Sequence, residues 1–373
     1  MSLFFIACGG TGGHLSPGIS LAESLQVQGH ECILIVSRKS IDGRLLEKYP
    51  HLRFRRAPGP GLAWNPVGLA RFVVSQTQAL FFAAKLLVQR RPAAFVSFGG
   101  FLTLGMAVVC KLAGVPVILH EANRIPGKAV RLLGRIANRV WLPPGVVIRG
   151  LSPVQIRHAA FPVRKEIQRL PKAEARQALG MPVDGKLLLV LGGSQGAAPL
   201  NKWVKESFEK LASSGINVLC VTGPDKAGFE PIYLNDAGGV SRCAVFIPFC
   251  AQMSEALSAA DLIVSRAGAG SIAEITACEL PAILVPFPFA ADRHQDENAR
   301  FFEQQGGGVV IKQSQLGQLA DEVTNVLNDE WLLERFCENL RRMRSEFDWH
   351  AMVVDLLDMT GGAVDSSRQE VRI

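Results

Sequence analysis

A glycine-rich segment near the N-terminus could bind an anion. A short apolar run leads into residues 9–14, which read GGTGGH, and a helical pattern follows. Missing side chains expose backbone N–H groups, and a helix N-terminus adds partial positive charge, so an anion or a developing anion is favoured there. A tight strand-to-helix turn would explain one or two of the glycines, but not four of them together with a histidine.

The second half of the chain carries two related segments. Residues 192–196 read GGSQG, a weak signal alone that the first segment strengthens. Residues 265–274 read SRAGAGSIAE and follow an apolar strand. Small residues at 269–271 would let a diphosphate reach the N–H groups of a helix start. Glu274, about one turn further, either complements the helix dipole or binds a ribose diol, and both interpretations stay open.

Two polar clusters also follow apolar strands. Residues 292–299 read DRHQDENA, and this density of donors and acceptors suits a sugar or a ribose. The alternative is a solvated helix start with Asp292 as its N-cap. Residues 120–123 read HEAN, where the histidine is more often structural and the amide of Asn123 could grip a sugar hydroxyl.

Several cofactor classes are disfavoured. The first glycine segment lacks the G-x-G-x-x-G spacing, and residues 36–39 (VSRK) offer no acid for a ribose, which leaves only an NADP site through Arg38 as an alternative. The eight cysteines form no C-x-x-C pair, and no D-x-D carboxylate pair ends a strand. We therefore expect no cofactor and no metal.

The elements that must position these segments alternate between apolar strands and helices, twice over. Continuous apolar strands separated by helices indicate parallel sheets covered on both faces, so the fold class is α/β with two doubly wound, Rossmann-like halves. The expected strands are Leu3–Cys8, Glu31–Val36, Ala94–Ser97, Val115–His120, Arg139–Leu142, Lys186–Leu191, Asn217–Thr222, Ala244–Ile247, Leu262–Ser265 and Ala282–Val285.

A chain of 373 residues is long enough for two domains. We expect a first domain over 1–162, joined by a C-terminal helix at about 345–360, and a second over 163–344. Residues 361–373 are expected to be a frayed tail. Ligands of such sheets bind outside the carboxyl ends of the strands, so both glycine segments are expected to line one cleft.

Charge is uneven along the chain. Residues 1–160 hold 19 Lys or Arg and 5 Asp or Glu, a net charge of +14, which leaves 21 of the 40 basic and 28 of the 33 acidic residues for the rest, a net of −7. The basic half indicates an anionic partner, although a merely solvated basic surface stays possible. The N-terminus has neither the basic region nor the cleavage site of a signal peptide, and no apolar run is long enough to span a membrane, so we expect a soluble, cytoplasmic protein.

One region mixes apolar, aromatic and basic side chains as an interfacial surface does. Residues 64–91 contribute most of it, and three arginines recur every four residues from Arg131, so we expect them to share one helix face. The alternative is a core-facing stripe with a solvated basic face. The expected membrane patch is Phe72, Phe81, Phe82, Lys85, Arg131, Arg135 and Arg139.

Six motifs in this order resemble the MurG family of glycosyltransferases, which belongs to glycosyltransferase family 28 and has the GT-B fold. They are GGTGGH, HExN, PVR at the domain switch, GGSQG, SRAGAGSIAE and DRxQ, and they span about residues 3–350. The resemblance implies inverting transfer of N-acetylglucosamine from UDP-N-acetylglucosamine to the C4 hydroxyl of undecaprenyl-diphospho-N-acetylmuramoyl-pentapeptide, in peptidoglycan synthesis. It also implies a peripheral enzyme on the anionic surface of the bacterial inner membrane, at the cytoplasmic face, with no nucleic-acid partner.

The resemblance carries over to individual positions. It places the donor sugar and acceptor diphosphate at Thr11, Gly12 and Gly13, the N-acetylglucosamine at Asn123, and the uracil at Arg164 and the backbone of Ile247. It places the diphosphate at Ser194 and at the helix start formed by Ala269, Gly270, Ser271, Ile272 and Ala273. The ribose falls at Glu274, and the donor sugar at His294 and Gln295.

The chain departs from the family pattern at several positions. Phe161 stands where Asn is usual, Ala122 where Gln is common, and His294 replaces a frequent Gln. The loop at 98–103 lacks the Tyr and the Ser-Gly-Pro often seen there. These departures affect the acceptor side more than the nucleotide site.

The acceptor hydroxyl needs a base, and His14 is the first candidate because the pKa of a histidine lies close to working pH. Glu121 is the second. Two other functions stay open from the sequence: a UDP-N-acetylglucosamine 2-epimerase of the same architecture, and a non-catalytic protein that binds nucleotide sugars or lipid diphosphates. A nucleic-acid-binding protein is the weakest interpretation, because the basic half has no recognisable reading module.

Overall fold

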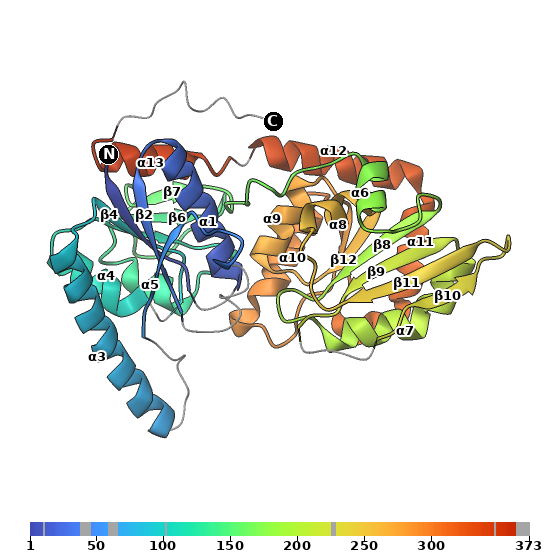
Figure 1. Cartoon of the computed structure of the whole chain (residues 1–373), viewed down its shortest axis with the longest axis horizontal. Helices are drawn as coiled ribbons and strands as arrows, with labels where there is room; N and C mark the ends of the chain where they lie inside the picture. Colours follow the sequence, from blue (N-terminus) through green and yellow to red (C-terminus); the bar gives the residue numbers. More distant parts are fainter. Residues whose placement is uncertain are drawn as a thin grey trace. The chain divides into compact units, whose positions relative to one another are not determined.

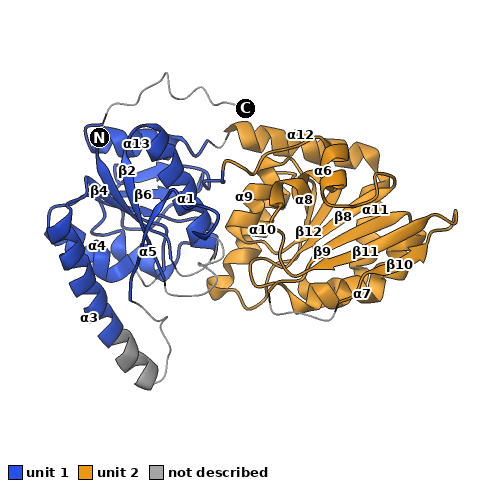
Figure 2. Ribbon diagram, viewed as in Figure 1, with its two compact units in different colours: residues 1–164, 347–373 blue, residues 165–346 orange. Residues whose placement is uncertain are grey.

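A computed structural model gives the fold of most of the chain. The described ranges are 1–9, 12–37, 46–58, 66–100, 103–224, 229–346 and 348–362. For residues 12 and 66–73 only the backbone is described. The chain divides into two compact units, residues 1–164 with 347–373 and residues 165–346, coloured separately in Figure 2.

Unit 1 is built on a seven-stranded parallel sheet with the order β3-β2-β1-β4-β5-β6-β7. Its strands are β1 (Leu3–Ala7), β2 (Glu31–Val36), β3 (Arg53–Arg56), β4 (Ala94–Ser97), β5 (Val117–His120), β6 (Arg139–Leu142) and β7 (Ile156–His158). Its helices are α1 (Gly12–Val27), α3 (Pro66–Gln89), α4 (Thr103–Leu112), α5 (Lys128–Leu133) and α13 (Ala351–Met359).

Both faces of this sheet are covered, as the continuous apolar strands predict. Phe4 and Ile6 of β1 join the core beneath α1 and α13, whereas Phe5 and Ala7 join the core beneath α3, α4 and α5. Successive side chains of a strand point to opposite faces, which is why every residue of β1 after Leu3 is buried. Figure 1 shows the C-terminal helix α13 beside the first strands, so the end of the chain completes unit 1.

Unit 2 repeats the plan with the order β10-β11-β9-β8-β12-β13-β14, parallel except for the pair β10–β11. Its strands are β8 (Lys186–Leu191), β9 (Ile216–Val221), β10 (Ile232–Asn235), β11 (Ser241–Ile247), β12 (Leu262–Ser265), β13 (Ala282–Leu284) and β14 (Gly308–Val310). Its helices are α6 (Lys172–Ala178), α7 (Ala198–Ser213), α8 (Met253–Ala259), α9 (Ala269–Ala277), α10 (His294–Gln304), α11 (Leu319–Asn328) and α12 (Glu330–Glu346), with 3-10 turns η1 (Ala291–Arg293) and η2 (Gln313–Gln318).

The predicted fold class is confirmed, and each predicted strand is present to within a few residues. The four edge strands, β3, β7, β10 and β14, were not predicted. β3, β7 and β10 are polar or half-exposed, and β14 has only three residues, so none shows a long apolar run. The predicted terminal helix is present as α13.

Each sheet reverses its winding at one point. In unit 1 the chain runs from β1 outward through β2 and β3 and then returns to the other side of β1 as β4. In unit 2 it runs from β8 outward and returns as β12. Crevices at such switch points, outside the carboxyl ends of the strands, are where doubly wound sheets bind ligands. The segments after β1, β4, β8 and β12 therefore define where each unit's site is expected.

Candidate functional site: two switch points

At the switch point of unit 1, the side chain of His14 packs against the backbone of two glycines. Gly99 and Gly100 follow β4 with φ values of +102° and +84°, a conformation that L side chains rarely adopt. A Cβ built on Gly99 would lie 3.4 Å from Nε2 of His14, and one on Gly100 would lie 3.7 Å from its Nδ1. The imidazole in the first turn of α1 therefore packs on the glycines after β4, at the point where the sequence places a candidate base.

The turn between β1 and α1 is also tightly packed. A Cβ on Gly9, two residues after the end of β1, would lie 2.2 Å from the backbone nitrogen of Ser37, so only glycine fits there. Gly12 begins α1, and Gly13 is exposed on its first turn. Thr11 lies outside the described residues.

His120, at the end of β5, is a neutral core histidine beside His14. Burial, and to a smaller extent the charge of His14, lower the pKa of His120 to about 3. Its ring centroid lies 4.9 Å from that of Phe98 and 6.1 Å from that of Phe161. The structural interpretation of this histidine is therefore the better one, and Phe161 forms part of its aromatic surroundings.

Glu121 organises the loop that follows β5. The carboxylate is buried and accepts hydrogen bonds from the backbone N–H of Asn123 (2.8 Å), from Nδ2 of Asn123 (3.0 Å) and from the backbone N–H of Gly127 (2.6 Å). A carboxylate that accepts three hydrogen bonds from its own loop is held in place. Its geometry thus fixes the carboxamide of Asn123 at the carboxyl edge of the sheet.

In unit 2, the turn after β8 is locked by backbone contacts. A Cβ on Gly196 (φ +68°) would lie 1.9 Å from the carbonyl oxygen of Thr222. The same oxygen accepts a hydrogen bond of 2.9 Å from Nδ2 of the buried Asn201. Gly193 closes the turn by accepting a 2.9 Å bond from the N–H of Gly196. Ser194 is exposed at this turn, beside the switch point.

Two buried polar side chains, those of Arg266 and Asn298, form hydrogen bonds that support the segment leading into α9. Arg266 donates to the carbonyl oxygens of Val285 (3.0 Å) and Pro286 (3.2 Å) and to the side chain of Gln313 (2.5 Å). Burial lowers the pKa of its guanidinium. Nδ2 of Asn298 donates to the carbonyl oxygen of Ala267 at 3.1 Å. The sequence analysis did not identify Arg266, Asn298 or Asn201 as important for the site.

The first turn of α9 can receive an anion. Its N-cap is Gly268, which has no side chain to cap the helix, and the first turn, which includes Gly270 and Ser271, contains no acidic residue. Unsatisfied N–H groups and the helix dipole favour negative charge at such a start. The helix begins at Ala269 and continues through Ile272 and Ala273. Glu274 follows on the same helix and is half-buried.

The loop after β13 contains the last predicted residues. Oε1 of Gln295 accepts a 2.9 Å bond from the backbone N–H of Phe287, and Nδ1 of His294 lies 2.7 Å from the carbonyl oxygen of Ala291. Asp292 and Arg293 both have positive φ, near 50°. The expectation that Asp292 caps the helix is wrong, because α10 begins at His294 with Arg293 as its N-cap and has no side-chain cap bond.

The two residues expected at the uracil belong to different units. Ile247 ends β11, and its carbonyl oxygen accepts bonds from the backbone N–H (2.8 Å) and the hydroxyl (3.3 Å) of Thr222. Arg164 is half-buried at the end of the first segment of unit 1. Each is described here only within its own unit.

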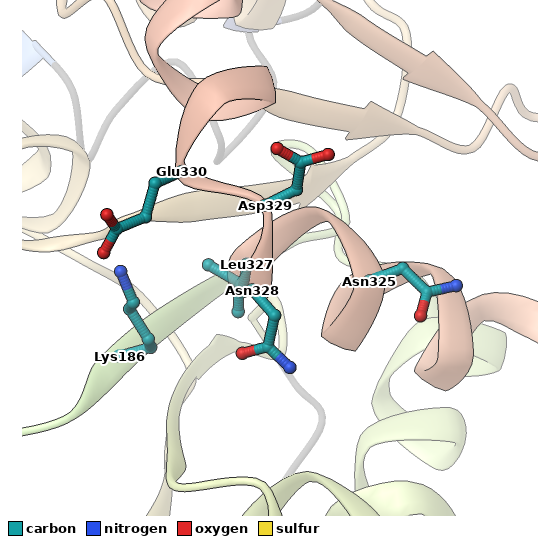
Figure 3. A pocket seen from close by; sticks show the side chains of 6 residues that line it. All are labelled: Lys186, Asn325, Leu327, Asn328, Asp329 and Glu330. Atoms are coloured by element: carbon teal, nitrogen blue, oxygen red, sulfur yellow. The ribbon is translucent and has the colours of Figure 1, made fainter.

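A separate hollow of about 620 Å³ lies at the other end of β8. Figure 3 shows Lys186, the first residue of that strand, extending toward Glu330 at the start of α12. Since ligands bind outside the carboxyl ends of strands, this hollow is not the expected site. Within the described ranges, no three His, Cys, Asp or Glu side chains gather to hold a metal ion.

The expected membrane patch is only partly one surface. On α3, Phe81 is 73% exposed, Lys85 is exposed and Phe82 packs partly into the core. Exposed Val74 and Val88 lie on the same helical face as Phe81. Phe72 lies on α3 with its side chain outside the described part.

The expectation that Arg131, Arg135 and Arg139 share a helix face is wrong. The helix α5 ends at Leu133, before the chain turns into β6. Arg131 and Arg135 are exposed. Arg139 is the first residue of β6, and its Nε lies 3.0 Å from a carboxylate oxygen of Asp355. Arg139 therefore anchors α13 within unit 1 and is not part of the basic surface.

Known proteins resemble this chain along nearly its whole length. The model of the glycosyltransferase family 28 N-terminal domain matches residues 4–142, and that of the family 28 C-terminal domain matches residues 187–339. The UDP-N-acetylglucosamine–N-acetylmuramyl-(pentapeptide) pyrophosphoryl-undecaprenol N-acetylglucosamine transferase of Opitutus terrae is 51% identical over 96% of both chains. The transferase of the same name from Desulfotalea psychrophila is 34% identical over 90% of both.

A solved structure supports the fold. Acinetobacter baumannii MurG superposes with a TM-score of 0.69, covering 95% of this chain and 99% of that one, at 24% sequence identity. Two Rossmann-like units that match the N- and C-terminal domains of glycosyltransferase family 28 define a glycosyltransferase of the GT-B class. The chain belongs to glycosyltransferase family 28.

Proposed function

We propose that this enzyme transfers N-acetylglucosamine from UDP-N-acetylglucosamine to the C4 hydroxyl of the muramyl sugar in undecaprenyl-diphospho-N-acetylmuramoyl-pentapeptide, with inversion. The observation that carries the proposal is the 51% identity with the Opitutus terrae transferase across 96% of both chains. The two relatives described above share that name, which favours the transferase over an epimerase or a non-catalytic binding protein.

In this proposal, unit 2 binds the donor. The diphosphate lies at the first turn of α9, where the uncapped N–H groups favour its charge, with Ser194 of the neighbouring turn beside it. Glu274 accepts hydrogen bonds from the ribose hydroxyls. Gln295 and His294 lie at the donor sugar, and Ile247 lies at the uracil.

Unit 1 supplies the acceptor side. His14 takes the proton of the attacking hydroxyl, and its ring is held in place by the backbone at Gly99 and Gly100. Glu121 is the weaker candidate base, because its carboxylate already accepts three hydrogen bonds that organise its loop. We assign Glu121 the task of orienting Asn123 toward the sugar.

As the anomeric bond breaks, negative charge grows on the departing UDP. A helix start whose N–H groups are already oriented stabilises such charge without reorganising during the reaction. Arg266 and Asn298 keep that helix start in place from the buried side. Because Ala269, Gly270 and Ser271 are small, the phosphates can approach the backbone N–H groups.

The lipid acceptor requires the enzyme to reach a membrane surface. Among the described residues, no helix is both long and apolar enough to cross a bilayer. We propose peripheral binding at the cytoplasmic face of the inner membrane through Phe81 and Lys85 of α3 and through Arg131 and Arg135, which are exposed apolar and basic residues of unit 1.

One assay tests the reaction and the site. Labelled UDP-N-acetylglucosamine is incubated with a lipid-linked muramyl-pentapeptide analogue and with the wild type, His14→Ala or Glu274→Ala. The wild type is expected to form the disaccharide, and both variants to be strongly impaired. Equal turnover in all three would discard the site, and release of the manno epimer without acceptor would favour the epimerase.

Vesicle binding tests the membrane surface. Phe81→Ser with Lys85→Glu is expected to weaken sedimentation with anionic vesicles by about tenfold, since one basic residue near a surface contributes about 1 kcal/mol and an aromatic ring adds apolar area. Lys202→Glu, on an exposed position of unit 2, is the control. Equal binding by both variants would contradict this surface.

A further inference from the structure

Glu279 occupies a helix end that favours glycine. It follows Cys278, the C-cap of α9, and has a φ of 53°, in the left-handed region. Its backbone N–H bonds the carbonyl oxygen of Thr276 at 3.1 Å, and that of Leu280 bonds the carbonyl oxygen of Ile275 at 3.1 Å. Glycine is the common residue at such an end because it has no Cβ. A strained backbone of this kind persists only where the surrounding contacts hold it.

The side chain supplies those contacts. It is buried, and its carboxylate pairs with three guanidinium groups, those of Arg169 (2.7 Å), Arg344 (3.2 Å) and Arg341 (3.4 Å). The backbone carbonyl oxygen of Glu279 accepts a hydrogen bond of 3.6 Å from Sγ of Cys337. The three arginines are about half exposed, so each pair is screened, but together they enclose a single buried acid.

These arginines come from the two ends of unit 2. Arg169 lies in the segment by which the chain enters the unit at Lys165, and Arg341 and Arg344 lie in the last turns of α12, by which it leaves at Glu346. One carboxylate thus holds the entry segment, the exit helix and the C-terminal end of α9 together.

Apart from Arg266 and Asn298, which support its start, α9 packs mainly through partly buried side chains. Ile275 is its one fully buried side chain, so apolar packing restrains the helix weakly. Nine residues span roughly 13 Å at the usual rise, which places its first turn about that distance from Glu279. The ion pairs of Glu279 at the C-terminal end of α9 therefore affect how rigidly the first turn of this helix is held.

We propose that Glu279 is a positioning residue for the donor site. Its three arginine contacts fix the C-terminal end of α9 and thereby hold the N–H groups at Ala269–Ser271 in the orientation that binds the nucleotide diphosphate. The inference rests on the proposed donor site at this helix start, and it assigns Glu279 no contact with substrate.

The sharpest variant is Glu279→Gly. Glycine adopts the backbone conformation of this position without strain, so the substitution removes the carboxylate while leaving the helix end favourable. We expect the Kd for UDP and the KM for UDP-N-acetylglucosamine to rise by about five- to tenfold, because the diphosphate is bound less firmly. The value of kcat should fall by no more than a similar factor, because the same N–H groups also stabilise the departing UDP.

Glu338→Gln is the matched control. Glu338 also pairs with an arginine, Arg335, but at an exposed position of α12, and its loss is expected to leave both constants unchanged. Arg344→Gln removes one half-exposed partner of Glu279 and should give a smaller rise in the same direction. It carries the test if Glu279→Gly fails to fold.

An unchanged Kd for UDP in folded Glu279→Gly, or in Arg344→Gln if that variant carries the test, would overturn the inference. A fall in kcat with unchanged KM would do so as well. Glu274→Ala separates this failure from that of the donor site: if it also binds UDP normally, the assignment of the nucleotide to α9 is wrong. If only Glu274→Ala weakens UDP binding, the donor site stands and the role of Glu279 falls.

Discussion

The two switch points share a topology and differ in chemistry. At the switch point of unit 1 an imidazole packs on glycines and an amide is fixed by a buried carboxylate. At the switch point of unit 2 the helix α9 starts without a side-chain cap, and Asn201, Arg266 and Asn298 are buried in the neighbouring segments. Winding direction fixes where a doubly wound sheet binds, and the residues of the turns decide whether that place moves protons or holds phosphates.

The largest expected effect is a loss of turnover caused by a change in unit 1. If His14 is the base, His14→Ala lowers kcat by about 10²- to 10⁴-fold, the usual contribution of a general base. UDP binding is expected to stay at the wild-type value, because the proposed diphosphate and ribose contacts are residues of unit 2. Turnover with a lipid-linked acceptor and calorimetry with UDP measure the two quantities. A large loss of UDP affinity would show that the division of labour between the units is wrong.

The second effect is on the stability of the unit 2 turn. Gly196→Ala places a Cβ 1.9 Å from the Thr222 carbonyl oxygen at a positive φ, and we expect it to lower the free energy of unfolding by about 3 kcal/mol. Gly193→Ala is the matched control, since its φ is also positive but no atom lies within 4 Å, and it should cost about 1 kcal/mol. Urea unfolding measures both. Equal losses would mean that the contact with Thr222 is unimportant.

The third prediction tests the donor side. Glu274→Ala is expected to raise the KM for UDP-N-acetylglucosamine by about thirtyfold, or about 2 kcal/mol, as a carboxylate that bonds a ribose diol is removed. The value of kcat should change little. Glu206→Gln, an exposed carboxylate on α7, serves as the control. Kinetics at varied donor concentration distinguish this result from a lowered kcat, which would place Glu274 at the reacting atoms.

The smallest effect is a difference in acid sensitivity between the units. The pKa of His120 in the folded chain, about 3, lies below the usual 6.5, so the unfolded chain binds the proton first as pH falls. Stability is therefore complete above pH 6.5 and decreases toward pH 3, by about 1.4 kcal/mol at pH 5.5. Unit 2 has a single histidine, the half-buried His294.

Unfolding of wild type and His120→Gln between pH 7.5 and 5.5 checks this prediction. The variant should lose about 1.4 kcal/mol less over that range. His158→Gln, at an exposed position of unit 1, should behave as the wild type. Parallel pH curves for the wild type and His120→Gln would contradict the role of the buried imidazole.

Apolar periodicity was enough to predict the central strands of both sheets, because a strand buried on both faces has to be apolar throughout. It missed β3 and β10, in which charged or polar residues alternate with partly buried ones. The spacing of Arg131, Arg135 and Arg139 matched a helix, but Arg139 starts β6 and pairs with Asp355, more than 200 positions later in the chain. Local spacing carries no information about such a partner.

Glycine spacing and strand hydrophobicity are local properties, so they were enough to predict the two-unit α/β plan and the turns where ligands are expected. The folded chain was needed to show that Glu121 orients Asn123, that Arg266 and Asn298 support the segment before α9, and that Glu279 pairs with three arginines. Most of these contacts join residues that are far apart in the chain, and folding alone brings them within hydrogen-bonding distance. A buried polar group can be understood only from the partners that satisfy it.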